Sequence, residues 1–371
     1  MEVKTHCLMN TVRFVSNDKK QFATILKKNV NDFFKEKNLS TKGNLNMAIK
    51  SIVMLALYFV PFILVLTMSL PGWLLFLLSV IMGVGMAGVG MSVMHDAAHG
   101  SFSQKTWLNN LMGKTIYLLG GSVFTWKVQH NIKHHTFTNI SGYDEDIANK
   151  GLIRLSFHKP LKKMHRFQHI YAFGFYMLMT LNKIGVDFKQ LFEYNKEGIT
   201  GEQKLEPRSE LIKMLVQKSM YLFVFLGLPL LFTSYSWWVI LLGFLLVNFI
   251  AGAIMSIVFQ MAHIVEGIEQ PMPKEGVIEN QWAIHELVTT SNFSKNNQLL
   301  SWYIGGLNYQ IEHHLFPNIC HVHYHKIAPI VEKTAKEFGL KYNVTPTFFK
   351  ALILHIRMLK LLGTQANQLI R

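Results

Sequence analysis

The chain has 371 residues, half of them hydrophobic, and carries a net charge of +15. Its two cysteines, Cys7 and Cys320, form neither a disulfide framework nor a zinc-binding spacing, which excludes a small disulfide-rich secreted domain and fits a reducing cytoplasm. A basic chain can bind nucleic acid, but here the excess of Lys and Arg flanks long apolar stretches. We therefore expect a membrane protein with no nucleic-acid partner.

Two windows, residues 51–94 and 219–262, contain no Asp, Glu, Lys or Arg. A membrane-spanning helix needs roughly 20 apolar residues, so each window predicts two spans joined by an uncharged turn. The alternative is a set of long buried helices in a soluble core. The four spans are expected at about 52–69, 73–93, 220–233 and 237–261.

The remaining segments are polar and basic, and they predict the orientation. Positive charge is retained on the cytosolic side of a membrane, so we expect both termini and all charged segments there. These segments are residues 1–50, 95–218 and 263–371, and residues 1–371 form a single domain. The predicted fold is an all-α integral membrane protein, with four transmembrane helices in two hairpins and a helical cytosolic cap holding a di-metal site. No secretory signal peptide is expected at the N-terminus.

Histidines gather in four clusters near the predicted membrane boundary. The first cluster follows the second span, the third ends the fourth span, and the paired histidines have helical spacing, which brings their rings to one face. The clusters are His95 and His99; His130, His134 and His135; His263; and His313 with His314, preceded by Gln310. Isolated histidines such as His6, His158 and His355 are expected at the surface or in a core.

Eight imidazoles exceed the four ligands of a closed tetrahedral site, so they predict two metal ions with about four ligands each. Imidazole suits zinc, copper, iron and nickel, so the ligand type leaves the metal open. Bound imidazoles also need a partner for the second ring nitrogen. The acids that could serve are close in sequence to the ligands: Asp96, Glu312, Asp144, Asp146 and Glu266.

The clusters His95-x-x-x-His99, His130-x-x-x-His134-His135 and Gln310-x-x-His313-His314, spaced around two membrane hairpins, resemble the three histidine boxes of membrane fatty acid desaturases. The glutamine that opens the third box resembles the front-end and bacterial linoleoyl-CoA-type subgroup. The resemblance covers about residues 52–341. Gln310 stands where other desaturases have a ninth histidine, and it is expected to ligate weakly, to bind through water or to form a hydrogen bond, with Asp96 and Glu312 as further ligands or supports.

The resemblance implies an O2-dependent oxidoreductase with two iron ions in a non-haem centre. It implies that the eight histidines are the ligands, with no catalytic residue beyond them, and that a cis double bond is introduced into a fatty acyl chain carried by CoA or by a lipid, for example in a Δ6-type reaction. The sequence contains no His-Pro-Gly-Gly haem motif, so no fused cytochrome b5 domain is expected and electrons would come from a separate ferredoxin or cytochrome b5 type of donor. The expected location is a bacterial inner membrane.

Two other readings of the same pattern remain open. A hydroxylase or ketolase would use the same scaffold, and the spacing does not separate it from a desaturase. A membrane metal transporter would need ionisable groups within the spans, and the two apolar windows contain no acidic or basic residue. The position of the double bond, the acyl carrier, the donor and the oligomeric state do not follow from the sequence.

Overall fold

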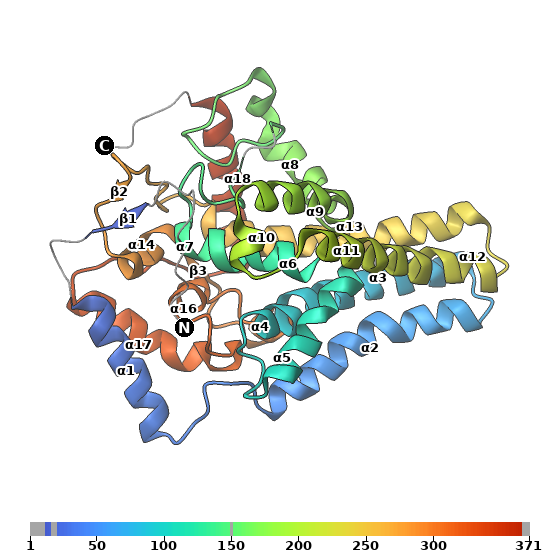
Figure 1. Cartoon of the computed structure of the whole chain (residues 1–371), viewed down its shortest axis with the longest axis horizontal. Helices are drawn as coiled ribbons and strands as arrows, with labels where there is room; N and C mark the ends of the chain where they lie inside the picture. The colour runs from blue at the N-terminus through green and yellow to red at the C-terminus, as the bar shows by residue number, and fades with distance from the viewer. Residues whose placement is uncertain (1–11, 16–20, 149–150, 366–371) are drawn as a thin grey trace.

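The computed structural model describes residues 12–15, 21–148 and 151–365, and the chain in these ranges is almost entirely helical. Four helical segments are long and apolar enough to cross a membrane. They lie side by side and extend to the right in Figure 1, away from a cap formed by the rest of the chain. The segments are Leu45–Thr67, Gly72–Ala98, Pro207–Phe232 and Trp237–His263.

Two of these segments consist of more than one helical type. The first segment is α2 (Leu45–Thr67), which begins where the side chain of Asn44 accepts a hydrogen bond from the backbone of Met47. The second and third segments both contain a π-helical stretch, and the fourth is the single helix α13. Their bounds are α3 (Gly72–Gly88), η1 (Val89–Met94), α4 (His95–Ala98), α11 (Pro207–Leu222), η5 (Phe223–Gly227), α12 (Leu228–Phe232) and α13 (Trp237–His263).

Between the two hairpins, the cap contains short helices and a helical pair. These elements are α5 (Thr106–Gly113), η2 (Lys114–Leu119), α6 (Val123–Trp126), η3 (Lys127–His134), α7 (His135–Phe137), η4 (Lys163–Phe167), α8 (Gln168–Met177), α9 (Met179–Lys196) and α10 (Ile199–Glu202).

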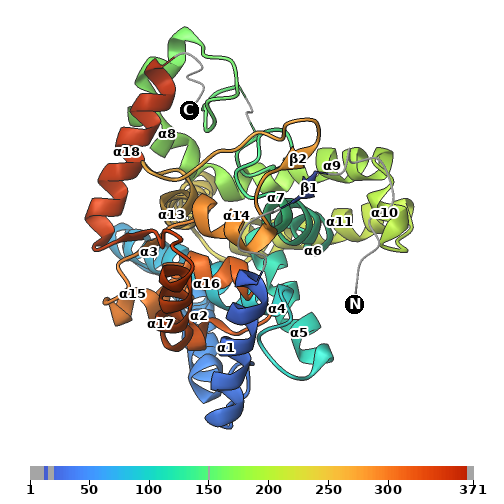
Figure 2. The same ribbon diagram turned by 90° about the vertical axis from the view of Figure 1, so that its left-hand side faces the viewer.

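The N-terminal and C-terminal parts complete the cap, which Figure 2 shows face on. Two parallel pairs of two-residue strands tie distant segments together, β1 to β2 and β3 to β4. The elements are β1 (Arg13–Phe14), α1 (Phe22–Glu36), β2 (Val277–Ile278), α14 (Trp282–Thr289), β3 (Asn292–Phe293), α15 (Gln298–Tyr303), α16 (Gln310–Leu315), η6 (His321–His323), α17 (Tyr324–Glu337), β4 (Val344–Thr345) and α18 (Phe348–Thr364).

The third apolar helix begins at Pro207, well before the expected residue 220. The side chain of Glu206 caps it, and Pro207 suits its first turn. The helix therefore includes Lys218, whose ammonium is buried and donates to Asp187 Oδ2 on α9 at 2.8 Å. A charge that has a buried partner can lie within an apolar helix, so the rule of uncharged windows placed this start too late.

The helical pair α8–α9 packs against the middle of α13. Thr180 donates a hydrogen bond to the carbonyl of Asn248 at 3.0 Å, and Ser256 donates to the carbonyl of Tyr176 at 3.3 Å. A Cβ atom on Gly252 would lie 2.5 Å from the carbonyl oxygen of Met177. The turn between the two helices therefore needs glycine on α13 to approach this closely.

Two apolar clusters are the largest among the described residues. The larger one lies between the spanning helices and includes Met54, Met86, Ala251 and Met255. The smaller one joins α1, α14, α16 and α17 within the cap. The segment 89–99, which carries the first histidine cluster, begins in the larger core with Val89, Met91 and Val93 and continues to the histidines at its end.

A candidate metal centre

All eight predicted histidines come together at the base of the cap. The ring nitrogens of four of them lie within 4.8 Å of one another, as do those of two overlapping groups of three. Two imidazole nitrogens on opposite sides of one metal ion are about 4 Å apart, so each group is close to the size of a metal site. The groups are His95, His99, His130 and His313; His134, His263 and His314; and His135, His313 and His314.

The second histidine cluster depends on a π-helical turn. Residues Lys127–His134 form η3, and His135 begins α7 directly after it. In an α-helix, the side chains of residues i and i+5 point in different directions. A π-helix has a wider turn with i→i+5 hydrogen bonds, so the side chains of residues i+4 and i+5 both point close to the direction of residue i. His134 and His135 can therefore both join His130. The spacing of four and five residues in the sequence was a signal for this turn.

The second ring nitrogens of three ligands have polar partners. His134 Nδ1 lies 3.1 Å from Asp144 Oδ2, as the sequence suggested. His314 Nδ1 lies 2.8 Å from Glu286 Oε2, and His313 Nδ1 lies 3.2 Å from the Tyr324 hydroxyl. The sequence analysis missed Glu286 and Tyr324, because neither is near a histidine box and a buried acid in a short helix carries no distinctive spacing.

The predicted supporting acids differ in their placement. Asp96 is buried, and its nearer histidine partner is His321 rather than His95. Its Oδ2 lies 2.8 Å from His321 Nδ1, whereas its Oδ1 lies 3.9 Å from His95 Nδ1. Glu312 accepts hydrogen bonds from Tyr342 and Asn292 and has none with a histidine ring among the described residues. Asp146 lies 3.4 Å from His134 Nδ1. Glu266 is exposed and makes no hydrogen bond or ion pair with a histidine among the described residues.

Gln310 is buried beside the two histidines of its box, and its Nε2 has no hydrogen-bond partner among the described residues. Of the isolated histidines, His355 is buried with both nitrogens bonded, and His158 is partly buried against the carbonyl of Gln270. His6 and Cys7 lie outside the described residues.

The electrostatics favour neutral imidazoles, which is the form that binds metal. Burial, followed by the influence of neighbouring imidazoles, holds the pKa of five of these rings well below the usual value: His99, His130, His135, His313 and His314. Burial acts in the same direction on His134, but Asp144 and Asp146 outweigh it and raise that pKa to about 9.

The donor set fits metal ions. Several buried ring nitrogens have no hydrogen-bond partner among the described residues, including His99 Nε2, His313 Nε2, His314 Nε2 and both nitrogens of His263. Buried polar atoms are rarely left without a partner, and a cluster of such nitrogens aimed at one another is what metal coordination requires. Aromatic rings close one side, with Trp126 centred 4.5 Å from the His130 ring and Phe259 centred 6.3 Å from it.

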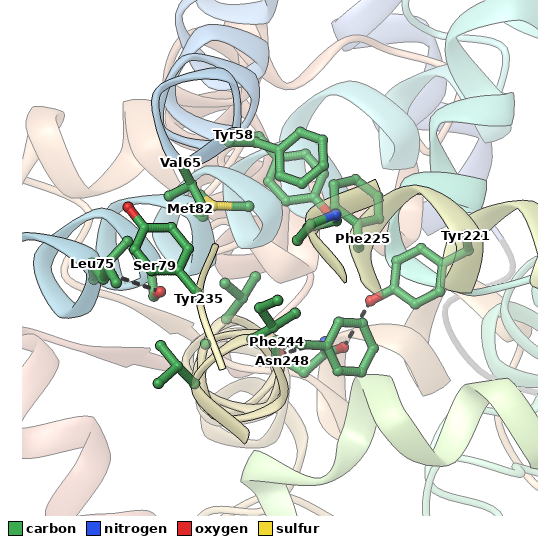
Figure 3. A pocket seen from close by; sticks show the side chains of 16 residues that line it. Tyr58, Val65, Leu75, Ser79, Met82, Tyr221, Phe225, Tyr235, Phe244 and Asn248 are labelled. Atoms are coloured by element: carbon green, nitrogen blue, oxygen red, sulfur yellow. Dashed lines mark hydrogen bonds between the residues drawn. The ribbon is translucent and has the colours of Figure 1, made fainter. Parts of the chain in front are cut away.

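An apolar pocket also lies between the spanning helices, with Tyr58, Met82 and Phe244 among its lining residues (Figure 3). At its edge the Tyr221 hydroxyl donates to Asn248 Oδ1 at 3.1 Å. Asn248 lies about 22 Å from His263 along α13, at about 1.5 Å per residue. Buried Met86, Met91 and Met255 belong to the core that lies between these two levels, so this pocket is separate from the histidine cluster.

The chain is similar in sequence to proteins of one family. The profile described as "Fatty acid desaturase" matches residues 71–346. A protein of Arthrospira platensis named "sn-1 linoleoyl-lipid 6-desaturase" is 34% identical, with 91% of this chain and 92% of that protein covered. A Synechocystis protein of the same name is 31% identical over 96% and 99% of the two chains. The "Acyl-lipid (8-3)-desaturase" of Physcomitrium patens is 34% identical over 95% and 74%.

Proposed function

Because the chain belongs to the fatty acid desaturase family, we propose that it introduces a cis double bond into the acyl chain of a membrane lipid, between an existing double bond and the carboxyl end. The observation that carries the proposal is the convergence of eight buried or partly buried imidazoles into overlapping groups. The relatives named for linoleoyl-lipid and acyl-lipid substrates support a lipid-bound acyl chain over acyl-CoA and a front-end position of the new bond.

We assign the eight histidines as ligands of two iron ions. His95, His99, His130 and His313 would hold one ion, and His134, His263 and His314 the other, with His135 between them. Iron supplies the oxidation of an unactivated methylene with O2 and electrons, which no side chain of this protein can perform. The partners Asp144, Glu286 and Tyr324 orient three of the rings through their second nitrogens. The assignment leaves Gln310 as a ninth ligand through its amide oxygen, direct or through water, because this residue is buried in the same short helix as His313 and His314.

The surroundings of the site follow from the same proposal. The four apolar helices make the chain an integral membrane protein. The net charge of +15 supports a cytosolic cap with both termini on that side. The membrane that we propose is a bacterial inner membrane. A separate electron donor of the ferredoxin or cytochrome b5 type would then approach the basic cap.

The proposal is tested by expressing the protein in a host that lacks polyunsaturated fatty acids and by supplying linoleate. Gas chromatography of the total fatty acids is expected to show a triene with its new double bond on the carboxyl side of the existing ones. A hydroxy or keto acid in place of the triene would assign the chain to lipid hydroxylation or ketolation, and an unchanged profile with metal uptake by the cells would support transport.

The ligand assignment is tested separately. His134→Ala is expected to abolish the product and to reduce the iron content of the purified protein, while the protein still fractionates with the membrane. His325→Ala is the control, because His325 is exposed on α17, away from the cluster. Full activity and full iron content in His134→Ala would remove His134 from the ligand set.

A further inference from the structure

One of the eight histidines is less enclosed than the rest. His99 is partly exposed, whereas the other seven are buried. Its Nε2 is nevertheless shielded from solvent and has no hydrogen-bond partner among the described residues. The histidine cluster therefore comes closest to the surface at His99, where α4 ends.

Lys127 lies near this opening. It begins η3, one turn before His130, and it directly follows Trp126, whose ring is centred 5.8 Å from the His99 ring. Burial and the neighbouring imidazoles are larger causes of the lowered pKa of His99, and the charge of Lys127 adds a smaller effect in the same direction. The side chain of Lys127 is partly buried, and burial lowers its own pKa.

The ammonium of Lys127 has no hydrogen bond or ion pair among the described residues, unlike other lysines with shielded side chains around it. Lys133 pairs with Glu145 and Glu197 at 2.7 and 2.9 Å. Lys183 donates to Gln129, and Lys218 pairs with Asp187. The Lys127 ammonium is not fully buried, so water can reach it and it remains available to donate to a ligand.

A second polar group near the opening also lacks a partner. Asn131 follows Lys127 by about one turn of η3, and its Nδ2 donates to the carbonyl of Ala98 at 3.2 Å, beside His99. Its Oδ1 is buried and accepts no hydrogen bond among the described residues. Lys127 and Asn131 thus present a donor and an acceptor on the segment that faces the end of α4.

The opening lies at the level where lipid meets the cap. Helix α5 packs against α4, and its Trp107 and Leu111 are 61% and 54% exposed. Exposed tryptophan next to the end of a membrane-spanning segment is typical of the bilayer interface. In Figure 2, α5 and α6 lie on the same side of the molecule, next to α4. A lipid in the adjacent leaflet can therefore reach this opening with its headgroup region.

We propose that Lys127 binds the carbonyl end of the acyl substrate at this opening. The inference rests on the proposed function and deepens it. A double bond that is counted from the carboxyl end requires a fixed distance between the carbonyl group and the metal centre. The Lys127 ammonium donates to the ester or thioester carbonyl oxygen, or to an adjacent phosphate oxygen, and it thereby sets which methylene reaches the imidazole cluster.

The experiment compares Lys127→Met, which keeps the length and apolar stem of the side chain, with Lys127→Arg, which keeps a donor. Membranes with each variant receive vesicles of linoleoyl-phosphatidylcholine or linoleoyl-CoA, and the products are located by mass spectrometry. The loss of a charge-assisted hydrogen bond is expected to raise the apparent KM about tenfold in Lys127→Met and to spread the double bond over neighbouring positions. Lys127→Arg should retain one position.

Lys114→Met is the matched control, because Lys114 is an exposed lysine of the same part of the cap. It also tests the alternative that Lys127 only attracts an acidic electron donor, in which case both Met variants would change the KM for the donor and neither would change the KM for the lipid. An unchanged lipid KM and a single product position in Lys127→Met would overturn the inference. A wild-type protein that makes no double bond would instead contradict the proposed function. A defect with only one of the two substrates would identify the acyl carrier.

Discussion

Glu286 supports His314 from outside the histidine boxes. Its Oε2 lies 2.8 Å from His314 Nδ1 and also accepts a hydrogen bond from Thr138, so one buried carboxylate holds both a ring and the loop after the second box. Partners of this kind fix the tautomer and the orientation of a metal-binding imidazole. The carboxylate is therefore expected to matter for metal retention although it touches no metal itself.

The variant Glu286→Ala is expected to weaken iron binding 10- to 100-fold, in the range found for partners of metal-binding histidines. Iron retained after dialysis against a graded series of chelator concentrations measures the effect. Glu286→Gln is the control, because the amide oxygen can still accept the hydrogen bond and should preserve most of the affinity. Equal iron retention in Glu286→Ala and wild type would show that the contact is dispensable.

His355 is expected to make stability depend on pH. It is buried on α18, donates from Nδ1 to the carbonyl of Ile264 at 2.7 Å and accepts from the Tyr176 hydroxyl. Burial lowers its pKa to about 4, below the usual 6.5 or so. The unfolded chain therefore binds the proton first as the pH falls, so the stability contributed above pH 6.5 is lost on acidification, by about 2 kcal/mol at pH 5.

Thermal unfolding of the detergent-solubilised protein at pH 7 and pH 5 measures this loss. His355→Gln removes the titrating group and should reduce the difference between the two melting temperatures, whereas His325→Gln at the surface should not. If both variants lose the same stability as wild type on acidification, His355 does not account for the acid sensitivity.

The sequence alone predicted which rings would meet but little of what surrounds them. Repeated spacing identified the histidines of the boxes, and their positions at the ends of apolar windows predicted a common depth. Asp144 was predicted because it lies near its ligand in sequence. Glu286 and the true direction of Glu312 could not be predicted, because both depend on how α14 and α16 pack together in the cap.

The packing of α13 against the α8–α9 turn depends on a single glycine. A side chain at Gly252 would meet the backbone carbonyl of Met177 at 2.5 Å, and a backbone atom cannot yield as the end of a flexible side chain can. On the same helix, a Cβ atom at Gly243 would meet only Ser79 Oγ at 3.4 Å, which is an ordinary contact. The two glycines therefore form a matched pair.

Gly252→Ala is expected to destabilise the protein by about 1–3 kcal/mol, the usual cost of overpacking. Gly243→Ala should change stability little or raise it slightly, because alanine favours a helix over glycine. The melting temperatures of both variants in the same detergent provide the measurement. A loss that is as large for Gly243→Ala as for Gly252→Ala would contradict a specific contact at Gly252.

The apolar helices were easier to predict than their ends. Uncharged windows located four of them, since charge is costly inside a bilayer. The rule failed at the start of the third helix because Lys218 is buried against Asp187, and a partner on another helix leaves no mark in a local window. The first helix likewise begins at Leu45, before the buried Lys50, whose Nζ contacts His321 Nε2.

The chain as a whole carries +15 charges, and this affects its encounter with an electron donor. Small electron carriers are commonly acidic, and the attraction between opposite net charges speeds association at low salt. The attraction is screened over about 10 Å at 0.1 M ionic strength. Donor capture should therefore depend on salt even if the metal centre does not.

Turnover at a low donor concentration is expected to fall several-fold when NaCl is raised from about 0.05 to about 0.3 M, whereas turnover at saturating donor should change little. Steady-state rates with a purified ferredoxin or cytochrome b5 test this at both donor concentrations. An equal decrease at both concentrations would point to an effect of salt on the enzyme itself, and no decrease would argue against charge-guided association.

The π-helical turn over Lys127–His134 has a consequence for comparing sequences. Such a turn holds one residue more than an α-helix of the same rise, and in η3 it lets rings four and five residues after His130 reach one centre. A chain that lacked one residue between His130 and His134 would have spacings of three and four, which a regular α-helix already brings to one face. A single-residue gap here in an alignment is therefore an exchange of helical types that preserves the same three ligands. It is no evidence that a ligand has been gained or lost.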